Sequence, residues 1–385
     1  MATHEKWNWI QHPTLLLKGN VAKANIKRMA EKAQRLGLRF RPHYKTHQSA
    51  EIAEWFRAEG VEAITVSSIE MAEYFANAGW KDILIAFPVN IRAAASLNAL
   101  GKKVRLGLVI SDIESLLPLA GLIESPVDIW IEIDSGDRRS GFNFDNSAAM
   151  LSVVRALPSF PNLRFAGLMG HGGFTYRSHG LEEIHNSHTQ DIENLMKAKR
   201  ALLDAKIDGF AVSTGDTPAC SREESYGGAD EIRPGNFVFY DVQQQHIGSC
   251  GFEHVAVALA CPVVAVYPHR GEVIVHGGGV HLGKDSLTDA AYGQHYGRVA
   301  LVTENGWEMP EMGCYLRSIS QEHGVAVIRP DLIGQIKVGD LLAVLPVHSC
   351  MSADLMMRLH DVDSAEPQRP IFMMKAQHGL GQLPC

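Results

Sequence analysis

The sequence predicts an α/β fold, a (β/α)8 barrel over residues 15–245, followed by an antiparallel β domain over residues 246–385 that also takes up residues 1–14. Two observations carry this prediction. Up to about residue 245, short β-branched runs alternate with helical segments, and such alternation requires parallel strands whose crossover helices cover the sheet. Beyond that point, short apolar runs are separated by Gly, Pro, Asp and His without a long helical pattern, which is typical of antiparallel strands.

The barrel prediction depends on eight candidate strands within roughly 230 residues. They are Leu38–Pro42, Val61–Val66, Ile83–Phe87, Val104–Val109, Val127–Asp134, Leu163–Met169, Gly209–Ser213 and Phe237–Tyr240. Two helical segments end at Gly60 and Gly79, because glycine is a good C-terminal helix cap. Residues 181–205 form the longest helical pattern and are expected to be the sixth helix. An open doubly wound sheet would need a glycine-rich fingerprint after the first strand, where the sequence instead has RPHYKTH, so the barrel is favoured.

Composition excludes several classes of protein. The 385 residues are 46% hydrophobic and 21% charged, which is ordinary for a folded globular protein. Lys and Arg number 36 and Asp and Glu 43, so 36 − 43 gives a net charge of −7, which disfavours a general nucleic-acid or membrane-surface binder. No stretch reaches the ~20 apolar residues of a membrane span, and the N-terminus lacks a secretory pattern. The six irregularly spaced cysteines argue against a disulfide framework, so a cytoplasmic location is expected.

Polar and glycine-rich segments follow the predicted barrel strands, where the active sites of such barrels lie. In chain order these segments contribute Lys45, Arg139, His171, Tyr176, the STGDTP segment of residues 213–218, and Tyr240. In STGDTP, Gly215 lets the backbone approach an anion, and the following residues can open a short helix whose N–H groups face a phosphate. Plain helix capping by Asp216 or Thr217 is the alternative for this segment.

The neighbouring residues distinguish Lys45 from an ordinary surface lysine. A lone lysine is ordinarily a solvated surface residue. Lys45 instead lies among His and Arg residues and, in the predicted barrel, opposite a phosphate-type loop, which makes it a candidate for Schiff-base chemistry with pyridoxal 5'-phosphate (PLP). Arg139 faces either a ring nitrogen or carboxylate, or solvent, and the sequence leaves both open.

His348 and Cys350 form an H-x-C pattern in the last apolar run. On a strand, side chains two residues apart point the same way, so the two can share one metal ion, and two protein ligands leave positions open for water and substrate. A core histidine with a buried thiol is the alternative. The glycines of HGGGVHLGKD, residues 276–285, predict a tight β turn rather than a functional segment.

Seven segments, in order, resemble the D-serine dehydratase-like branch of the fold-type III PLP enzymes, a superfamily that includes alanine racemase and D-threonine aldolase. They are RPHYKTH, DSGDRRSG, GLMGHGGFTY, STGDTP, RPGNFVFYD, HGGGVHLGKD and PVHSC, and they span essentially the whole chain. The resemblance implies a TIM barrel followed by a β domain, and a homodimer. Two departures stand out: Gln48, where lysine commonly follows KTH, and Gly170, where the aldolases tend to have tyrosine.

The resemblance also implies roles for individual residues. Lys45 looks like the Schiff-base lysine. The expected phosphate contacts are Thr214, Gly215, Asp216 and Tyr240, and the expected contacts around the pyridine ring are Arg139, His171 and Tyr176. His348 and Cys350 look like the zinc ligands of the dehydratase branch, because the aldolase branch typically has Asp in place of the cysteine.

The implied function is a PLP- and Zn2+-dependent lyase that acts on D-β-hydroxy amino acids, with D-serine dehydratase as the first expectation. One alternative keeps the site but cleaves Cα–Cβ, as D-threonine aldolase or 3-hydroxy-D-aspartate aldolase does. The other is a non-enzymatic PLP carrier, against which the additional β domain counts, since those proteins resemble the barrel alone. All three readings expect a small-molecule ligand, with neither a nucleic acid nor a membrane as partner.

Overall fold

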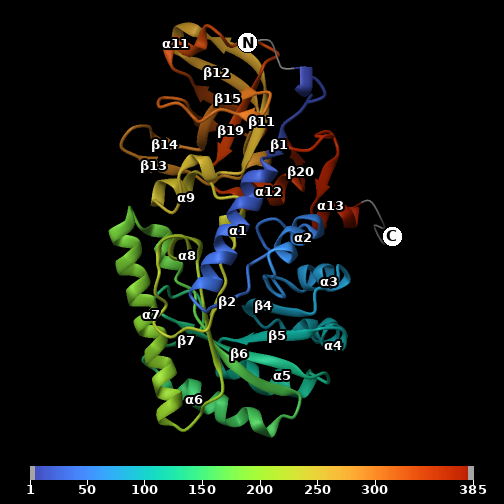
Figure 1. The fold of residues 1–385 in the computed structure, drawn as a ribbon, viewed down its shortest axis with the longest axis vertical. Coiled ribbons are helices and arrows are strands. Elements are labelled where there is room, and N and C mark those ends of the chain that lie inside the picture. Colours follow the sequence, from blue (N-terminus) through green and yellow to red (C-terminus); the bar gives the residue numbers. More distant parts are fainter. Residues whose placement is uncertain (1–4, 380–385) are drawn as a thin grey trace.

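A computed structural model describes residues 5–379 and has two parts, an α/β barrel and a β domain (Figure 1). The barrel sheet is parallel, in the order β2-β10-β9-β8-β6-β5-β4-β3. Its strands are β2 (Arg39–Phe40), β3 (Ala63–Val66), β4 (Asp82–Pro88), β5 (Arg105–Ile110), β6 (Val127–Asp134), β8 (Leu163–Met169), β9 (Ala211–Thr214) and β10 (Glu231–Ile232). A single bridge between His43 and Thr65 joins the two end strands, so the barrel nearly closes, as predicted.

Helices cover the outside of the barrel (Figure 1). They are α1 (Gly19–Arg35), α2 (Ala50–Ala58), α3 (Ile69–Asn77), α4 (Ala94–Gly101), α5 (Leu116–Leu122), α6 (Ser147–Ala156), α7 (Leu181–Asp204), α8 (Thr217–Arg222) and α9 (Val242–Ile247). The two helices predicted to end at glycine stop just before Gly60 and Gly79, whose φ angles of +78° and +91° suit glycine. The 24-residue α7 follows the sixth barrel strand, as expected.

One predicted strand is wrong. The segment Phe237–Tyr240 is not a strand: its first part belongs to a 3-10 turn, Asn236–Val238, and the last barrel strand is β10, five residues earlier. The segment is apolar because Phe237, Val238 and Phe239 are fully buried beside α1, not because it pairs in the sheet. Buried aromatic and β-branched residues favour strands in general, but packing decided their conformation here.

The β domain is antiparallel at its centre, as predicted. Its main strands are β11 (Val257–Tyr267), β12 (Glu272–His276), β15 (Gly297–Thr303), β17 (Tyr315–Ile319), β18 (His323–Val327), β19 (Leu341–Pro346), β20 (Arg358–Asp361) and β21 (Pro370–Phe372). Because β12 pairs with both β18 and β11, six of these strands close into a small barrel. The N-terminal strand β1 (Thr14–Leu17) pairs with β11 and β20, so the chain starts in this domain before α1 enters the barrel.

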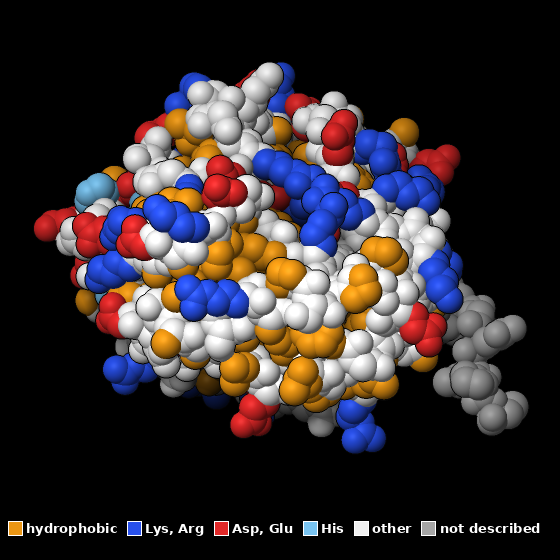
Figure 2. All heavy atoms as spheres, turned by 90° about the horizontal axis from the view of Figure 1, so that it is seen from below, with side chains coloured by type: hydrophobic (Ala, Val, Ile, Leu, Met, Phe, Trp, Pro, Cys, Tyr) orange, Lys and Arg blue, Asp and Glu red, His pale blue; other side chains and the backbone are white. Residues whose placement is uncertain are grey.

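Short elements complete the β domain. They are β13 (Leu287–Asp289), β14 (Gly293–His295), β16 (Gly306–Trp307), α10 (Gly279–Leu282), α11 (Pro330–Ile333), α12 (Ser349–Met356) and α13 (Met374–Gly379). A further two-residue strand, β7 (Phe142–Asn143), extends β6 in the barrel. At the end of the molecule farthest from the β domain, exposed apolar side chains lie among side chains of both charges (Figure 2). No helix within residues 5–379 has the length and apolarity that crossing a bilayer requires.

Candidate active site

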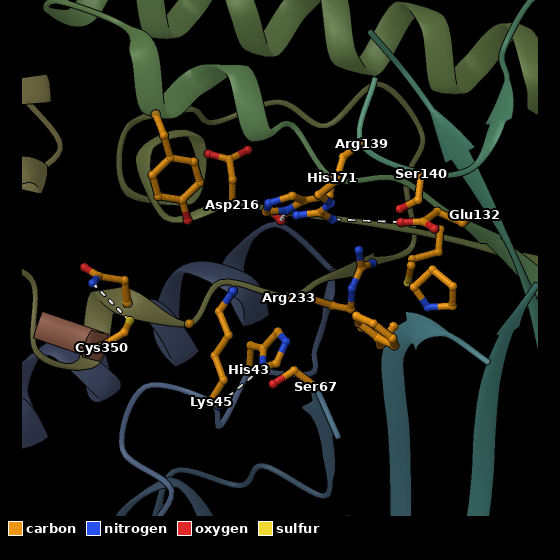
Figure 3. A pocket seen from close by; sticks show the side chains of 18 of the residues that line it. His43, Lys45, Ser67, Glu132, Arg139, Ser140, His171, Asp216, Arg233 and Cys350 are labelled. Atoms are coloured by element: carbon orange, nitrogen blue, oxygen red, sulfur yellow. Dashed lines mark hydrogen bonds and ion pairs between the residues drawn. The ribbon is translucent and has the colours of Figure 1, made fainter. Parts of the chain in front are cut away.

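A cavity of about 490 Å³ lies where the C-terminal ends of the barrel strands meet the start of α12 (Figure 3). The structure brings together in its wall six of the side chains that the sequence singled out: Lys45, Arg139, His171, Tyr176, His348 and Cys350. Gly215 and Asp216 line it as well. Loops that are far apart in the sequence therefore converge on one space.

Lys45 lies on the turn that follows β2, and its amine points into the cavity (Figure 3). The backbone N–H of Lys45 donates to Nδ1 of His43 at 3.3 Å. Burial, together with the nearby charges of Lys45 and Arg233, lowers the pKa of His43 well below its usual value. His43 is therefore neutral near Lys45, and the sequence analysis did not single it out although it stands in the same motif.

The loop after β9 combines a close backbone approach with a helix start. Gly215 has φ of +140°, and a Cβ there would lie 2.6 Å from the backbone nitrogen of Arg233. Asp216 caps α8 by accepting from the N–H of Ala219 at 2.8 Å, and it also accepts from the Thr175 hydroxyl at 2.7 Å. Asp216 therefore caps α8, as the alternative interpretation of this loop predicts. Its carboxylate is hydrogen-bonded within the protein, and burial raises its pKa to about 7.

Two other predicted phosphate contacts lie outside the cavity wall. The Tyr240 hydroxyl is 2.9 Å from the hydroxyl of Ser221 on α8, and burial raises the pKa of Tyr240 to about 12. Thr214 donates to a carboxylate oxygen of Asp191 at 3.2 Å. Both residues support the loop from behind, and their contact with a phosphate stays a prediction.

Arg233 is a cavity residue that sequence reasoning missed. It follows the last barrel strand, its side chain is fully buried, and it donates to the Gly170 carbonyl at 2.5 Å and to the Ser213 hydroxyl. Ser213 in turn donates to Glu231 at 2.6 Å. Burial lowers the pKa of Arg233 to about 10, so the group stays charged at neutral pH. Its presence in RPGNFVFYD directly after a strand was the available signal.

Arg139, Glu132 and His171 form a further part of the cavity wall. Arg139 is 56% exposed in its side chain and lies 3.8 Å from the buried carboxylate of Glu132. His171 receives its orientation from a 2.9 Å hydrogen bond between Nδ1 and the Gly215 carbonyl. Because burial, with Arg139 beside it, lowers the pKa of His171 to about 3, this imidazole is neutral and carries its proton on Nδ1.

His348 and Cys350 are adjacent, but not in the way expected. The predicted strand ends at Pro346, His348 occupies the N-cap position of α12, and Cys350 lies in the first helical turn. Burial alone would lower the pKa of His348 and raise that of Cys350, but their mutual attraction prevails and moves these values to about 9 and about 7. Each group therefore favours the charged form of the other, an imidazolium beside a thiolate.

Buried partners hold this pair in place. The Cys350 sulfur lies 3.2 Å from the Thr46 hydroxyl, and Asn236 donates to it at 3.5 Å. Asp241, which is fully buried, accepts from Asn236 at 2.7 Å and from the backbone N–H of Ser349 at 3.0 Å. Nδ1 of His348 lies 3.7 Å from the same Asp241 oxygen. A carboxylate behind a histidine is the usual arrangement around metal-binding imidazoles.

The donors present fit both groups that the resemblance implies. For PLP, an amine at one side of the cavity faces a glycine cradle, and a buried polar atom in the cavity wall, Asn236 Oδ1, has no hydrogen-bond partner among residues 5–379. For a metal, an imidazole and a thiolate form a donor set that suits Zn2+. A metal would replace the proton that His348 carries in its absence.

Comparisons with known proteins identify the family of the chain. The family model described as "Alanine racemase, N-terminal domain" matches residues 20–242, and the model described as "Putative serine dehydratase domain" matches residues 256–362. D-threo-3-hydroxyaspartate dehydratase of Delftia sp. (strain HT23) is 30% identical over 85% of this chain and 87% of its own length. D-serine dehydratase of Dictyostelium discoideum is 26% identical over 93% of this chain and 94% of its own length.

A solved structure extends the likeness to three dimensions. A cysteine-to-alanine variant of D-threo-3-hydroxyaspartate dehydratase, described as a metal-free form, superposes with a TM-score of 0.87 at 26% identity. The superposition covers 95% of this chain and 98% of that one. The chain therefore belongs to the D-serine dehydratase-like family of fold-type III PLP-dependent enzymes, in which an alanine racemase N-terminal domain precedes a serine dehydratase domain.

Proposed function

We propose that this protein is a PLP- and metal-dependent dehydratase that removes water from a D-β-hydroxy amino acid, with D-serine as its first substrate and D-threo-3-hydroxyaspartate as the second. The observation that carries the proposal is the presence of Lys45, His348 and Cys350 in the wall of one cavity. Such an elimination needs two parts. One is an amine that can remove the proton from Cα, and the other is a metal, held here by His348 and Cys350, that can bind the oxygen on Cβ.

The proposal assigns the cofactor to residues of the barrel. Lys45 would hold PLP covalently, the Gly215 loop with Thr214, Asp216 and Tyr240 would hold its phosphate end, and Arg139, His171 and Tyr176 would surround its ring. Arg233 joins this set because its charge is fixed at the cavity wall. When bound, PLP supplies an electron sink that stabilises negative charge at the substrate Cα.

The proposal assigns activation of the leaving hydroxyl to His348 and Cys350. His348 and Cys350 would hold a divalent ion, most suitably Zn2+, which supplies Lewis acidity toward the β-hydroxyl when bound. Thr46 and Asn236 keep the sulfur directed into the cavity. The cysteine favours dehydration over Cα–Cβ cleavage, because the resemblance places aspartate at this position in the aldolases.

Side chains of the cavity would move the α-proton of the substrate. Once the substrate amine has displaced it, Lys45 would accept the α-proton while the Cα–H and Cβ–O bonds break, a Cα=Cβ bond forms and the hydroxyl leaves as water. Hydrolysis of the C–N bond then takes up one water and releases ammonia, so there is no net change in water. The neutral His43 and His171 flank this amine without competing for the proton, since burial keeps both imidazoles unprotonated. For D-serine the balanced products are pyruvate and ammonia.

The test is a product assay on the purified protein loaded with PLP and zinc. D-serine should yield pyruvate, D-threo-3-hydroxyaspartate should yield oxaloacetate, each with ammonia, and L-serine serves as the control. A chelator should remove the activity, and zinc should restore it. Glycine released with acetaldehyde from D-threonine, or with glyoxylate from 3-hydroxy-D-aspartate, and without ammonia, would assign an aldolase instead. No turnover of any of these compounds by protein with bound PLP would assign a carrier.

A further inference from the structure

A second group of metal-type side chains lies in the β domain, outside the active-site cavity. His276 ends β12, His281 belongs to the single turn of α10, and Glu322 directly precedes β18. Nε2 of His276 lies 3.5 Å from Glu322 Oε2, and Nε2 of His281 lies 3.8 Å from the same oxygen. One donor atom from each of the three residues lies within 4.8 Å of the others.

The backbone is built to bring these three side chains together. Gly277 donates its N–H to the Glu322 carbonyl at 2.8 Å, and Gly279 donates to the Ser320 carbonyl at the same distance. A Cβ on Gly278 would lie 2.5 Å from the carbonyl oxygens of residues 320 and 321. The glycines of HGGGVHLGKD are therefore required by close packing against the turn that positions Glu322. The segment forms the single helical turn of α10, not the predicted β turn.

We propose that His276, His281 and Glu322 bind a divalent transition-metal ion, with Zn2+ as the best match, at a site separate from His348 and Cys350. Two imidazoles and one carboxylate are a known donor set for zinc, which leaves a fourth position for water. Adjacent ligand atoms around a tetrahedral zinc lie about 3.3 Å apart, given bond lengths of about 2.0–2.1 Å. The separations of 3.5 and 3.8 Å need only small side-chain movements to reach this value.

His281 can bind zinc if its ring proton moves from one nitrogen to the other. Burial lowers the pKa of His281, so its ring is neutral at neutral pH although Glu322 lies beside it. Without metal, Nδ1 of His281 accepts from the Gly278 N–H at 3.2 Å, which leaves the ring proton on Nε2. Zinc at Nε2 moves that proton to Nδ1, so this long hydrogen bond opens and coordinate bonds replace it.

A bound ion would join β12, α10 and the start of β18. The same α10 contacts α12, where the Ser352 hydroxyl donates to the Leu282 carbonyl at 3.0 Å. Because α12 also carries Cys350, the ion would brace the helix that forms one wall of the active-site cavity. The role proposed for the site is structural, and it does not depend on the reaction that the enzyme catalyses.

The experiment counts metal ions in the full-length PLP-bound enzyme. The protein is stripped with chelator, dialysed against excess zinc, passed through a desalting column and analysed by atomic emission. We expect two zinc ions per chain in the wild type, one in Glu322→Gln and one in Cys350→Ser. His269→Gln, an exposed histidine of the same domain outside the group, is the matched control and should keep two.

Cobalt substitution distinguishes the two sites by spectroscopy. Cobalt bound at Cys350 gives a sulfur-to-metal charge-transfer band, and a site of imidazoles and carboxylate gives only weak ligand-field bands. Glu322→Gln should keep the charge-transfer band and lose the second equivalent of cobalt, whereas Cys350→Ser should show the reverse. A wild type whose single bound cobalt gives the sulfur-to-metal band, or a Glu322→Gln variant that still binds two ions, would overturn the proposal whatever the enzyme's activity. His281→Gln, measured in the same way, covers the case in which Glu322→Gln fails to fold.

Discussion

Replacing Asp241 by asparagine tests whether the metal pair depends on the carboxylate behind it. One carboxylate oxygen, Oδ2, accepts from Asn236 and from the backbone N–H of Ser349. The other, Oδ1, caps α9 by accepting from the Gln244 N–H at 2.9 Å. An asparagine has one carbonyl oxygen and one NH2 group, so it cannot satisfy both sides. With NH2 toward Asn236 and Ser349, three buried donors lose their acceptor, namely the Asn236 amide and the backbone N–H and hydroxyl of Ser349.

The magnitude follows from those contacts. A buried donor left without its partner costs about 1–3 kcal/mol, so the two N–H donors alone lower the free energy of unfolding by roughly 2–6 kcal/mol. Loss of a residue behind a metal ligand typically weakens metal binding by about 10–100-fold, which corresponds to about 1.4–2.8 kcal/mol. We therefore expect Asp241→Asn to bind zinc at His348 and Cys350 at least about tenfold more weakly while the protein remains folded.

The assay is competition for zinc against a fluorescent chelator at a temperature far below unfolding, with urea unfolding measured in parallel. Asp112→Asn is the matched control, because Asp112 also caps a short helix, through the Ser115 N–H at 3.1 Å, but is exposed and remote from the metal pair. A folded Asp241→Asn protein with the zinc affinity of the wild type would refute the reasoning, since the carboxylate would then contribute nothing to the ligand's orientation.

Three further predictions concern the cofactor side of the site. Lys45→Ala should lower pyruvate formation from D-serine by about 10²–10⁴-fold, whereas Lys337→Ala, on the exposed β domain, should leave it unchanged. Gly215→Ala should weaken PLP binding by roughly tenfold or more, measured by the absorbance of bound cofactor, because its Cβ would lie 2.6 Å from a backbone nitrogen at a φ of +140°. Burial raises the pKa of Asp216 to about 7 from the ordinary 3.8, so between these pH values the folded protein holds a proton that the unfolded chain releases. The free energy of unfolding should therefore fall as pH rises from about 4 to about 7. Asp216→Asn should abolish that fall, which amounts to up to about 4 kcal/mol, in urea titrations across this pH range, and an unchanged pH profile would contradict it.

Much of the fold follows from local patterns in the sequence. Seven of the eight predicted barrel strands overlap observed ones, because most of those strands are short apolar runs, largely buried, between polar segments. The eighth, β10, has only two residues, and one of them is Glu231, whose carboxylate pairs inside the barrel with Arg41 at 2.7 Å. A charged residue in so short a strand breaks the apolar pattern, so the sequence pattern predicts the strand at the neighbouring apolar turn instead.

The site was predictable to a similar extent. Residues that stand out by type at strand ends, such as Lys45 and His171, line the cavity, as the barrel geometry requires. His43 and Arg233 were missed although each stands in one of the seven segments, because their role depends on burial next to other charges. The H-x-C pair was found, but its strand geometry was wrong, since the chain turns into α12 directly after Pro346.

The cofactor amine and the metal pair come from opposite ends of the chain, and direct contacts hold them at a fixed separation. Thr46, next to Lys45, contacts the Cys350 sulfur at 3.2 Å. Gln48 donates both to the Lys45 carbonyl at 3.1 Å and to Asp354 on α12 at 2.9 Å. Gln48 is one of the departures from the family pattern, and its φ of +43° shows that the turn is held in an unusual conformation. Because the elimination needs proton removal at Cα and oxygen binding at Cβ in one substrate, a loop tied to α12 in this way allows both groups to act on neighbouring carbons.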